Sequence, residues 1–229
     1  MTQRPFIIRH IVDNPIDTSL IPHILDEAQV AFVPVAQHGW PDQFPYFPQM
    51  EVRLAHTGTH LLVDYRVTET SVRAMAPHDN GNVWEDSCCE LFIAFITGSQ
   101  ANAETGNNTF YYNIECNAAG TLLMGYGQGR THRLRADQSI LNMVGRWSSM
   151  GSAPFDNLDG ERTWCLCLDI PACAFFRDNI RSLNGLHASG NIYKCGDKLP
   201  RPHFLSLYPI NTPKPDFHRP DCFGTIVFE

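Results

Sequence analysis

An indole and two carboxylates lie close together in the sequence, at Trp84, Asp86 and Glu90. Because successive side chains of a strand point to opposite faces, all three would project to one side of an extended segment. An indole can cover the apolar face of a pyranose, and a carboxylate accepts strong hydrogen bonds from the hydroxyl groups beside it. The spacing therefore favours a sugar-binding surface. In the alternative interpretation, Trp84 covers the core and Glu90 pairs with Arg66 of a neighbouring strand.

A second group of polar residues alternates along the chain shortly afterwards. One face of this predicted strand would carry Tyr111, Asn113, Glu115 and Asn117. Together they offer hydrogen-bond donors and acceptors at two-residue spacing, which suits recognition of a polyol. An ordinary solvated sheet face would show the same alternation, and both interpretations stay open.

Enzymatic chemistry has little support in the motifs of the chain. The sequence contains neither the G-x-S-x-G elbow of hydrolases nor the H-E-x-x-H motif of zinc proteases. A glycan hydrolase would have to use Glu90 and Glu115 as its acid and base, at a separation that the sequence does not specify. We therefore expect a non-catalytic protein, and keep a glycan hydrolase as the rival hypothesis.

The eight cysteines lie mostly in apolar segments, and no two of them form a C-x-x-C pair. Cys88 and Cys89 would point to opposite faces of a strand, so a zinc site is not predicted. The apolar stretch Phe6 to Ile8 is too short for the core of a signal peptide. We expect buried thiols in a reducing compartment, the cytoplasm, with export only if a leader has been removed.

The charge balance disfavours polyanionic partners. The 229 residues include 17 Lys or Arg and 24 Asp or Glu, for a formal net charge of −7, which argues against general binding to nucleic acid. The basic cluster between Arg130 and Arg135 is interpreted as a solvated loop. The longest apolar run, Leu91 to Ile96, is far shorter than the roughly 20 residues of a membrane-spanning helix, so no membrane partner is expected.

Alternating apolar residues predict many short strands. In the segment His60 to Thr68, one face would carry Leu61, Val63, Tyr65 and Val67. A single short helix is predicted within 17–31, followed by a loop that contains four prolines. Further strands are predicted at 84–95, 110–118, 120–126, 163–170, 191–195, 203–208 and 224–228.

These elements predict an all-β fold. Its expected form is an antiparallel β-sandwich, immunoglobulin-like or jelly-roll-like, with long loops and a short N-terminal helix. The low charged fraction of 18% and the 16 Gly and 16 Pro are typical of a loop-rich β protein. Because no repeat or linker divides the sequence, we expect one domain over 1–229, with 1–49 as a helix-and-loop extension packed on it.

The run from Val83 to Ile93 resembles the signature of the family 9 carbohydrate-binding modules. Similarity continues in 111–121, 191–197 and 216–224, and covers roughly 50–229. The resemblance implies a β-sandwich in which Trp84 is one half of an aromatic clamp and Glu90 bonds sugar hydroxyls. It also implies binding of the reducing end of a glucan or xylan chain, as in cellulose or xylan, and a structural calcium ion.

Two positions differ from the family pattern. Leu207 stands where the family places its second aromatic residue, so Tyr208 or an aromatic residue of a loop would have to replace it. Tyr111 stands where the family tends to carry Arg, which removes a cationic donor. A fold that has lost its sugar cleft and serves as a protein-interaction domain therefore stays open as a third hypothesis.

Our leading hypothesis is non-catalytic binding of an oligo- or polysaccharide. Trp84 would stack on a sugar ring and Glu90 would accept hydrogen bonds from its hydroxyls. The other candidate sugar-binding residues are Asn113, Glu115, Tyr111, Tyr208 and Arg66.

Overall fold

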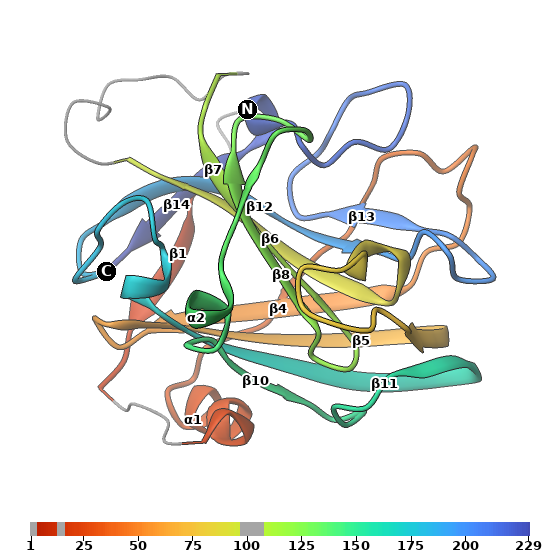
Figure 1. Ribbon diagram of the computed structural model, residues 1–229, viewed down its shortest axis with the longest axis horizontal. Helices are drawn as coiled ribbons and strands as arrows, with labels where there is room; N and C mark the ends of the chain where they lie inside the picture. Colours follow the sequence, from red (N-terminus) through yellow and green to blue (C-terminus); the bar gives the residue numbers. More distant parts are fainter. Residues whose placement is uncertain (1–3, 13–16, 97–107) are drawn as a thin grey trace.

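A 14-stranded sheet that curls on itself forms the body of the protein in the computed structural model, which describes residues 4–12, 17–96 and 108–229 (Figure 1). One half contains β2 (Val33–Pro34), β4 (Gln49–His56), β5 (His60–Ala74), β10 (Gly145–Ser148) and β11 (Phe155–Pro171). The other half contains β3 (Gln37–His38), β6 (Cys88–Phe95), β7 (Tyr111–Asn117), β8 (Leu122–Gly127), β9 (Leu134–Arg135), β12 (His187–Cys195), β13 (Phe204–Ser206) and β14 (Gly224–Phe228).

Strand β1 (Phe6–His10) joins the two halves. Its first residues pair in parallel with β14, and its last two pair in parallel with β4. The other pairings among the described strands are antiparallel. The prediction of a β protein is therefore confirmed, but the sheet is mixed rather than purely antiparallel, because an N-terminal strand enters between β4 and β14.

The main core lies between the two halves of the sheet. The alternating residues predicted to face inward all belong to one buried cluster, because each strand turns every second side chain to the same side. The sets are Leu61, Val63, Tyr65 and Val67; Cys89, Leu91, Ile93 and Phe95; Tyr112, Ile114, Cys116 and Ala118; and Trp164, Leu166, Leu168 and Ile170.

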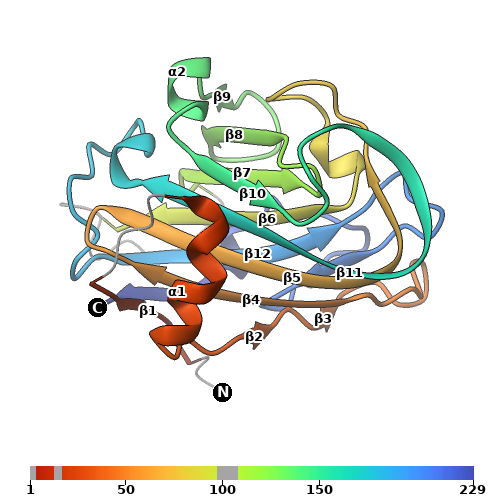
Figure 2. The same cartoon turned by 90° about the horizontal axis from the view of Figure 1, so that it is seen from below.

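Helix α1 (Ile21–Glu27) covers the outer face of β4 and β5 (Figure 2). It follows a 3-10 turn at Thr18–Leu20, whose first free amide is capped by the side chain of Asp17. Leu25 belongs there to the same buried cluster as Leu62 of β5. The segment 1–49 thus supplies strands β1, β2 and β3 to the sheet in addition to the predicted helix.

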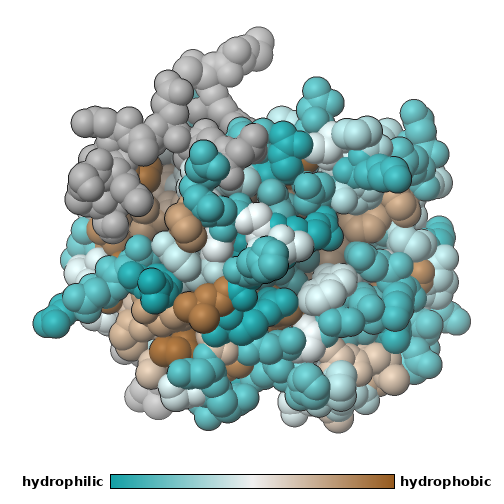
Figure 3. Space-filling model, turned by 45° about the horizontal axis from the view of Figure 1, so that its top comes forward, coloured by the Kyte–Doolittle hydropathy of each residue, from teal (hydrophilic) through white to brown (hydrophobic). Residues whose placement is uncertain are grey.

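The other helical segments are short. They are α2 (Gln138–Leu141) and 3-10 turns at Val83–Glu85, Ala172–Ala174 and Pro220–Cys222. Among the described residues, no helix has the length and apolar character needed to cross a membrane. On the face drawn in Figure 3, apolar residues form small areas within a largely hydrophilic surface.

All eight cysteines are free thiols, and five of them are buried, as predicted from their apolar surroundings: Cys88, Cys89, Cys116, Cys167 and Cys195. Cys88 and Cys89 belong to different clusters on opposite faces of β6, as the alternation of a strand requires.

Candidate functional site

A cleft of about 520 Å³ lies over the face of β6, β7 and β12 that points away from the main core. Strand residues form its floor, and loops from distant parts of the chain form its walls. The floor residues Glu90, Asn113 and Glu115 are almost completely buried, with 1–4% of each exposed. This face is therefore not the solvated surface of the alternative interpretation, because the surrounding loops shield its side chains from bulk solvent.

The two carboxyl groups of the floor come from neighbouring strands. Glu90 of β6 lies directly opposite Glu115 of β7 in the register of the sheet. Asn113 Nδ2 donates to Glu115 Oε1 at 2.7 Å, and Cys195 Sγ donates to Glu90 Oε1 at 3.0 Å. Burial, and next the charge of Glu115, raise the pKa of Glu90, while burial raises the pKa of Glu115. The floor thus offers carboxyl oxygens as acceptors, and both groups hold their protons to higher pH than exposed carboxyl groups do.

Basic side chains from the loop after β8 form one wall. Arg133 donates from Nε to Asn113 Oδ1 at 2.7 Å and from an Nη atom to the carbonyl of Tyr111 at 2.7 Å. Arg130 pairs with Asp216 at 3.0 Å, and Arg135 also lines the cleft. The sequence interpretation of this cluster as a solvated loop is therefore wrong for Arg133. The two-residue spacing of Arg133 and Arg135 was the available signal, since it is typical of residues that share one side of an extended segment.

Aromatic side chains form the remaining wall. Trp84 is half-buried and lines the cleft from the 3-10 turn at Val83–Glu85. Phe44, Phe204 and Phe217 line the same cleft, with 4.8 Å between the ring centroids of Phe44 and Phe204. The ring of Phe217 stacks on the ring of Tyr193, with 4.2 Å between the ring centroids. The sequence reasoning missed these three Phe residues individually, although it allowed for a loop aromatic in place of Leu207.

Asp86 does not join Trp84 and Glu90 in the cleft. The 3-10 turn interrupts the extended backbone, so the alternation expected from Trp84 onward does not apply. Asp86 is buried and accepts hydrogen bonds from the amide of Ala76 at 2.8 Å and from Asn117 Nδ2 at 2.9 Å. Asp86 and Asn117 therefore hold the start of β6 and the end of β7 together.

Three other predicted residues do not line the cleft. Tyr111 is buried beneath it, with its hydroxyl 2.7 Å from His218 Nδ1 and the Arg133 guanidinium 4.3 Å from its ring centre. Tyr208 is buried against Gly224, where the absence of a side chain leaves room for its ring. Tyr208 therefore supplies no second half of a clamp.

Arg66 lies on β5, in the other half of the sheet. Its guanidinium pairs with Glu51 at 3.0 Å and lies 4.2 Å from the ring centre of Phe32. The alternative interpretation, in which Arg66 pairs with Glu90, is thus incorrect, because the two residues belong to strands that are not neighbours.

The described residues do not fit a calcium ion held by side-chain carboxylates. Calcium takes six to eight oxygen ligands. Among the described residues, one group of at least three metal-ligating side chains is found, and it contains Cys88, Cys195 and the single carboxylate of Glu90. No role for calcium follows from this arrangement.

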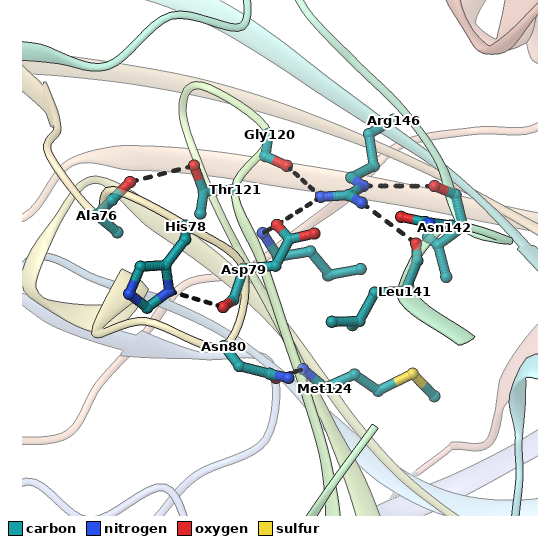
Figure 4. A network of polar contacts seen from close by, with 12 residues as sticks. Ala76, His78, Asp79, Asn80, Gly120, Thr121, Met124, Leu141, Asn142 and Arg146 are labelled. Atoms are coloured by element: carbon teal, nitrogen blue, oxygen red, sulfur yellow. Dashed lines mark hydrogen bonds and ion pairs between the residues drawn. The ribbon is translucent and has the colours of Figure 1, made fainter. Parts of the chain in front are cut away.

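A second cavity, of about 610 Å³, is lined by Asp79 and Arg146. Figure 4 shows the polar contacts of these two residues. Arg146 Nη1 donates to Asp79 Oδ1 at 2.7 Å and to the carbonyl of Gly120 at 3.1 Å, and Nη2 donates to the carbonyl of Leu141 at 3.2 Å. The two charges pair with each other and tie β10 to α2 and to the turn after β7. Asp79 and Arg146 therefore have a structural role, because they hold these segments together.

The chain matches the family model described as carbohydrate-binding family 9 over residues 19–228. It is 41% identical to a candidate carbohydrate-binding protein from Bacteroides uniformis ATCC 8492, with 99% of each chain covered and a TM-score of 0.90. Two structures of a family 9 carbohydrate-binding module from Caldicellulosiruptor kristjanssonii, in complex with glucose and with cellotriose, are each 11% identical and share the fold, with TM-scores of 0.54 and 0.52. These matches cover 99% of this chain and 96% and 94% of the modules. No curated protein matches the chain at a significant level.

Proposed function

The chain belongs to carbohydrate-binding family 9, and from that premise we propose that the cleft over β6, β7 and β12 binds a carbohydrate without transforming it. One observation carries the proposal: Trp84 and Glu90 line the same cleft, with the indole in a wall and the carboxyl group in the floor. This is the pairing of an aromatic surface with a hydroxyl acceptor that a sugar ring requires.

Each part of the cleft has a role in this proposal. The Trp84 indole covers the C–H face of one sugar ring, and Phe44 and Phe204 of the same aromatic wall extend the apolar contact. Glu90 and Glu115 accept hydrogen bonds from hydroxyls, and the charged guanidinium groups of the basic wall donate to hydroxyl oxygens. The polar floor supports a sugar ligand over the third hypothesis, because a protein-interaction domain that had lost its sugar cleft would present an occluded or apolar cleft.

We propose that the ligand is the end of a short β-linked glucan chain. A cleft of about 520 Å³ falls within the range of small-molecule sites, about 300–1,000 Å³, and suits one or two sugar rings. The glucose and cellotriose complexes of the family 9 module support a glucan over a xylan. An aromatic contact and each hydrogen bond contribute about 1 kcal/mol, so we expect micromolar to millimolar dissociation constants.

Calorimetric titration with glucose, cellobiose, cellotriose and xylotriose tests the proposal. We expect saturable heats for the gluco-oligosaccharides, weaker binding of xylotriose, and loss of binding when the reducing end of cellotriose is reduced to the alditol. Equal binding of the alditol would contradict end recognition, and the absence of heat with every sugar would contradict carbohydrate binding. The same oligosaccharides are incubated with the protein and chromatographed, and the appearance of shorter products would establish the glycan hydrolase instead.

A further inference from the structure

Two cysteines and a glutamate meet at the floor of the cleft. Cys88 on β6 lies directly opposite Cys195 on β12, and Glu90 follows two residues later on the same face of β6. One ligand atom from each side chain lies within 4.8 Å of the other two, and all three residues are buried. From this juxtaposition we propose that Cys88, Cys195 and Glu90 bind a thiophilic divalent cation such as Zn²⁺.

The three donors match the ligand preferences of Zn²⁺. Thiolate sulfur binds it at about 2.3 Å and carboxylate oxygen at about 2.0–2.2 Å, with tetrahedral geometry. Cys195 Sγ and Glu90 Oε1 are already 3.0 Å apart, so one ion between them needs only small side-chain movements. Three protein ligands leave one position for water or another small ligand.

An ion can reach these donors from the cleft. Glu90 and Cys195 both line it, whereas Cys88, which belongs to the same buried cluster as Cys195, does not. The guanidinium of Arg130 lines the same cleft. Two thiolates, one carboxylate and a divalent cation leave a net charge of −1, near a guanidinium that already pairs with Asp216.

Binding must displace protons. Burial raises the pKa of Cys88 to about 12, and burial raises the pKa of both Cys195 and Glu90. Without a cation, Cys195 Sγ donates a hydrogen bond to Glu90 Oε1. Because the cation competes with protons for these groups, affinity is expected to rise with pH.

This inference does not rest on carbohydrate binding, although Glu90 takes part in both proposals. Its test therefore contains no sugar. Reduced, metal-free protein is titrated with Cd²⁺, which occupies zinc sites and gives an ultraviolet thiolate-to-metal charge-transfer band. We expect the intensity of the band to reach its maximum at one equivalent of Cd²⁺. We expect added Zn²⁺ to displace the bound Cd²⁺ and so to remove the band.

The variants identify the ligands. Cys88→Ser and Cys195→Ser are each expected to lower Cd²⁺ affinity at least 100-fold, and Glu90→Gln to lower it about 10-fold while the band remains. The matched control is Cys173→Ser, because Cys173 is exposed and outside the cluster, and it is expected to bind Cd²⁺ like the wild type.

A measurement on the unaltered protein covers the case in which a cysteine variant does not fold. Because Cys88 and Cys195 are buried, their alkylation rates are compared with and without Zn²⁺ in mild urea, where the protein opens transiently, and are read by peptide mass spectrometry. Zn²⁺ is expected to slow modification of Cys88 and Cys195 and to leave the rate at Cys173 unchanged, and equal rates with and without Zn²⁺ at all three thiols would contradict the proposal. Absence of the charge-transfer band, equal loss of the band in Cys173→Ser, or a Cys88–Cys195 disulfide that resists reduction would each overturn the proposal.

Discussion

Glu90 and Glu115 lie directly opposite each other on β6 and β7, and both carboxyl groups are buried in the floor of the cleft. Two carboxylates on directly opposite residues repel each other, which disfavours ionisation of both groups at once. Burial acts in the same direction and raises the pKa of both groups. The pair therefore retains a proton at a pH where exposed carboxyl groups have lost theirs, which gives the cleft both a donor and acceptors for hydroxyl groups.

The first prediction concerns the dependence of stability on pH. A carboxyl group whose pKa is raised by folding binds protons more tightly in the folded state, so its contribution to stability falls as pH rises from the ordinary carboxyl range through the raised pKa. Glu115→Gln removes one such group and keeps an oxygen to accept from Asn113. We expect the stability of the variant relative to the wild type to increase from pH 4.5 to pH 8, because the raised pKa of Glu115 makes the folded wild type lose stability over this range.

Urea unfolding at several pH values measures this difference. The exposed residue Glu161 provides the control, because Glu161→Gln changes a carboxyl group without removing a buried one. If the free energy of unfolding of Glu115→Gln changes with pH as that of the wild type does, the pKa of Glu115 is not raised by folding.

The second prediction concerns the aromatic wall. Trp84→Ala removes the indole that we propose to stack on the sugar, and we expect a loss of about 1–3 kcal/mol in binding, or about 5- to 150-fold in Kd. Because Trp84 is half-buried at the edge of the cleft, the variant is expected to stay folded. Calorimetry with cellotriose measures the effect. Phe47→Ala, which removes an exposed aromatic ring outside the cleft, is expected to bind normally, and an equal loss in both variants would contradict the assignment.

The third prediction concerns Arg133, which connects the loop after β8 to β7. Its guanidinium donates to Asn113, to the carbonyl of Tyr111 and to the carbonyl of Gly129 at 2.7–2.8 Å. Arg133→Gln cannot make all three bonds, and we expect the free energy of unfolding to fall by about 2–3 kcal/mol, with weaker sugar binding, because Asn113 loses its fixed orientation.

Urea unfolding and calorimetry measure the two effects of Arg133→Gln. The exposed residue Arg162 offers the matched control, for which we expect less than about 0.5 kcal/mol. Unchanged stability and affinity in Arg133→Gln would show that Arg133 does not fix the orientation of Asn113 in the floor of the cleft.

The fourth prediction concerns a buried ion pair behind the cleft. Lys194 Nζ lies 3.1 Å from Glu69 Oε2, neither side chain is exposed, and Glu69 also accepts from Trp164 Nε1 at 2.9 Å. Lys194→Met leaves the carboxylate buried and uncompensated, so we expect a loss of about 3–5 kcal/mol in the free energy of unfolding.

The double variant Lys194→Met with Glu69→Gln tests the cause of that loss. It removes the charge but keeps an acceptor for Trp164, and we expect it to recover most of the lost stability in urea unfolding. A double variant as unstable as Lys194→Met alone would mean that the loss comes from altered packing rather than from an unpaired charge.

Much of the fold could be predicted because strand alternation is local information. The inward-facing set Cys89, Leu91, Ile93 and Phe95 was identified correctly from the two-residue period of β6. The same period failed just before β6, at Trp84 and Asp86, because a 3-10 turn at Val83–Glu85 replaces the extended backbone there. Strand β1 was also missed, since a strand of five residues with one buried side chain has too weak a pattern to recognise.

The candidate site was predicted only in part. Trp84, Glu90, Asn113 and Glu115 do line one cleft, whereas Arg66 and Tyr208 lie elsewhere. The residues that were missed, such as Arg133 and Phe217, come from loops, whose course depends on what they pack against and not on a repeating pattern.

The sequence by itself determined which side chains each strand turns to the core and which it turns away, because that choice depends on a two-residue period within one segment. Only the tertiary structure decided that β7 and β12 are the neighbours of β6, and so that Glu90 meets Glu115 on one side and Cys195 on the other. Pairing of strands about 100 residues apart depends on loop closure and register across the whole sheet, which no local pattern contains.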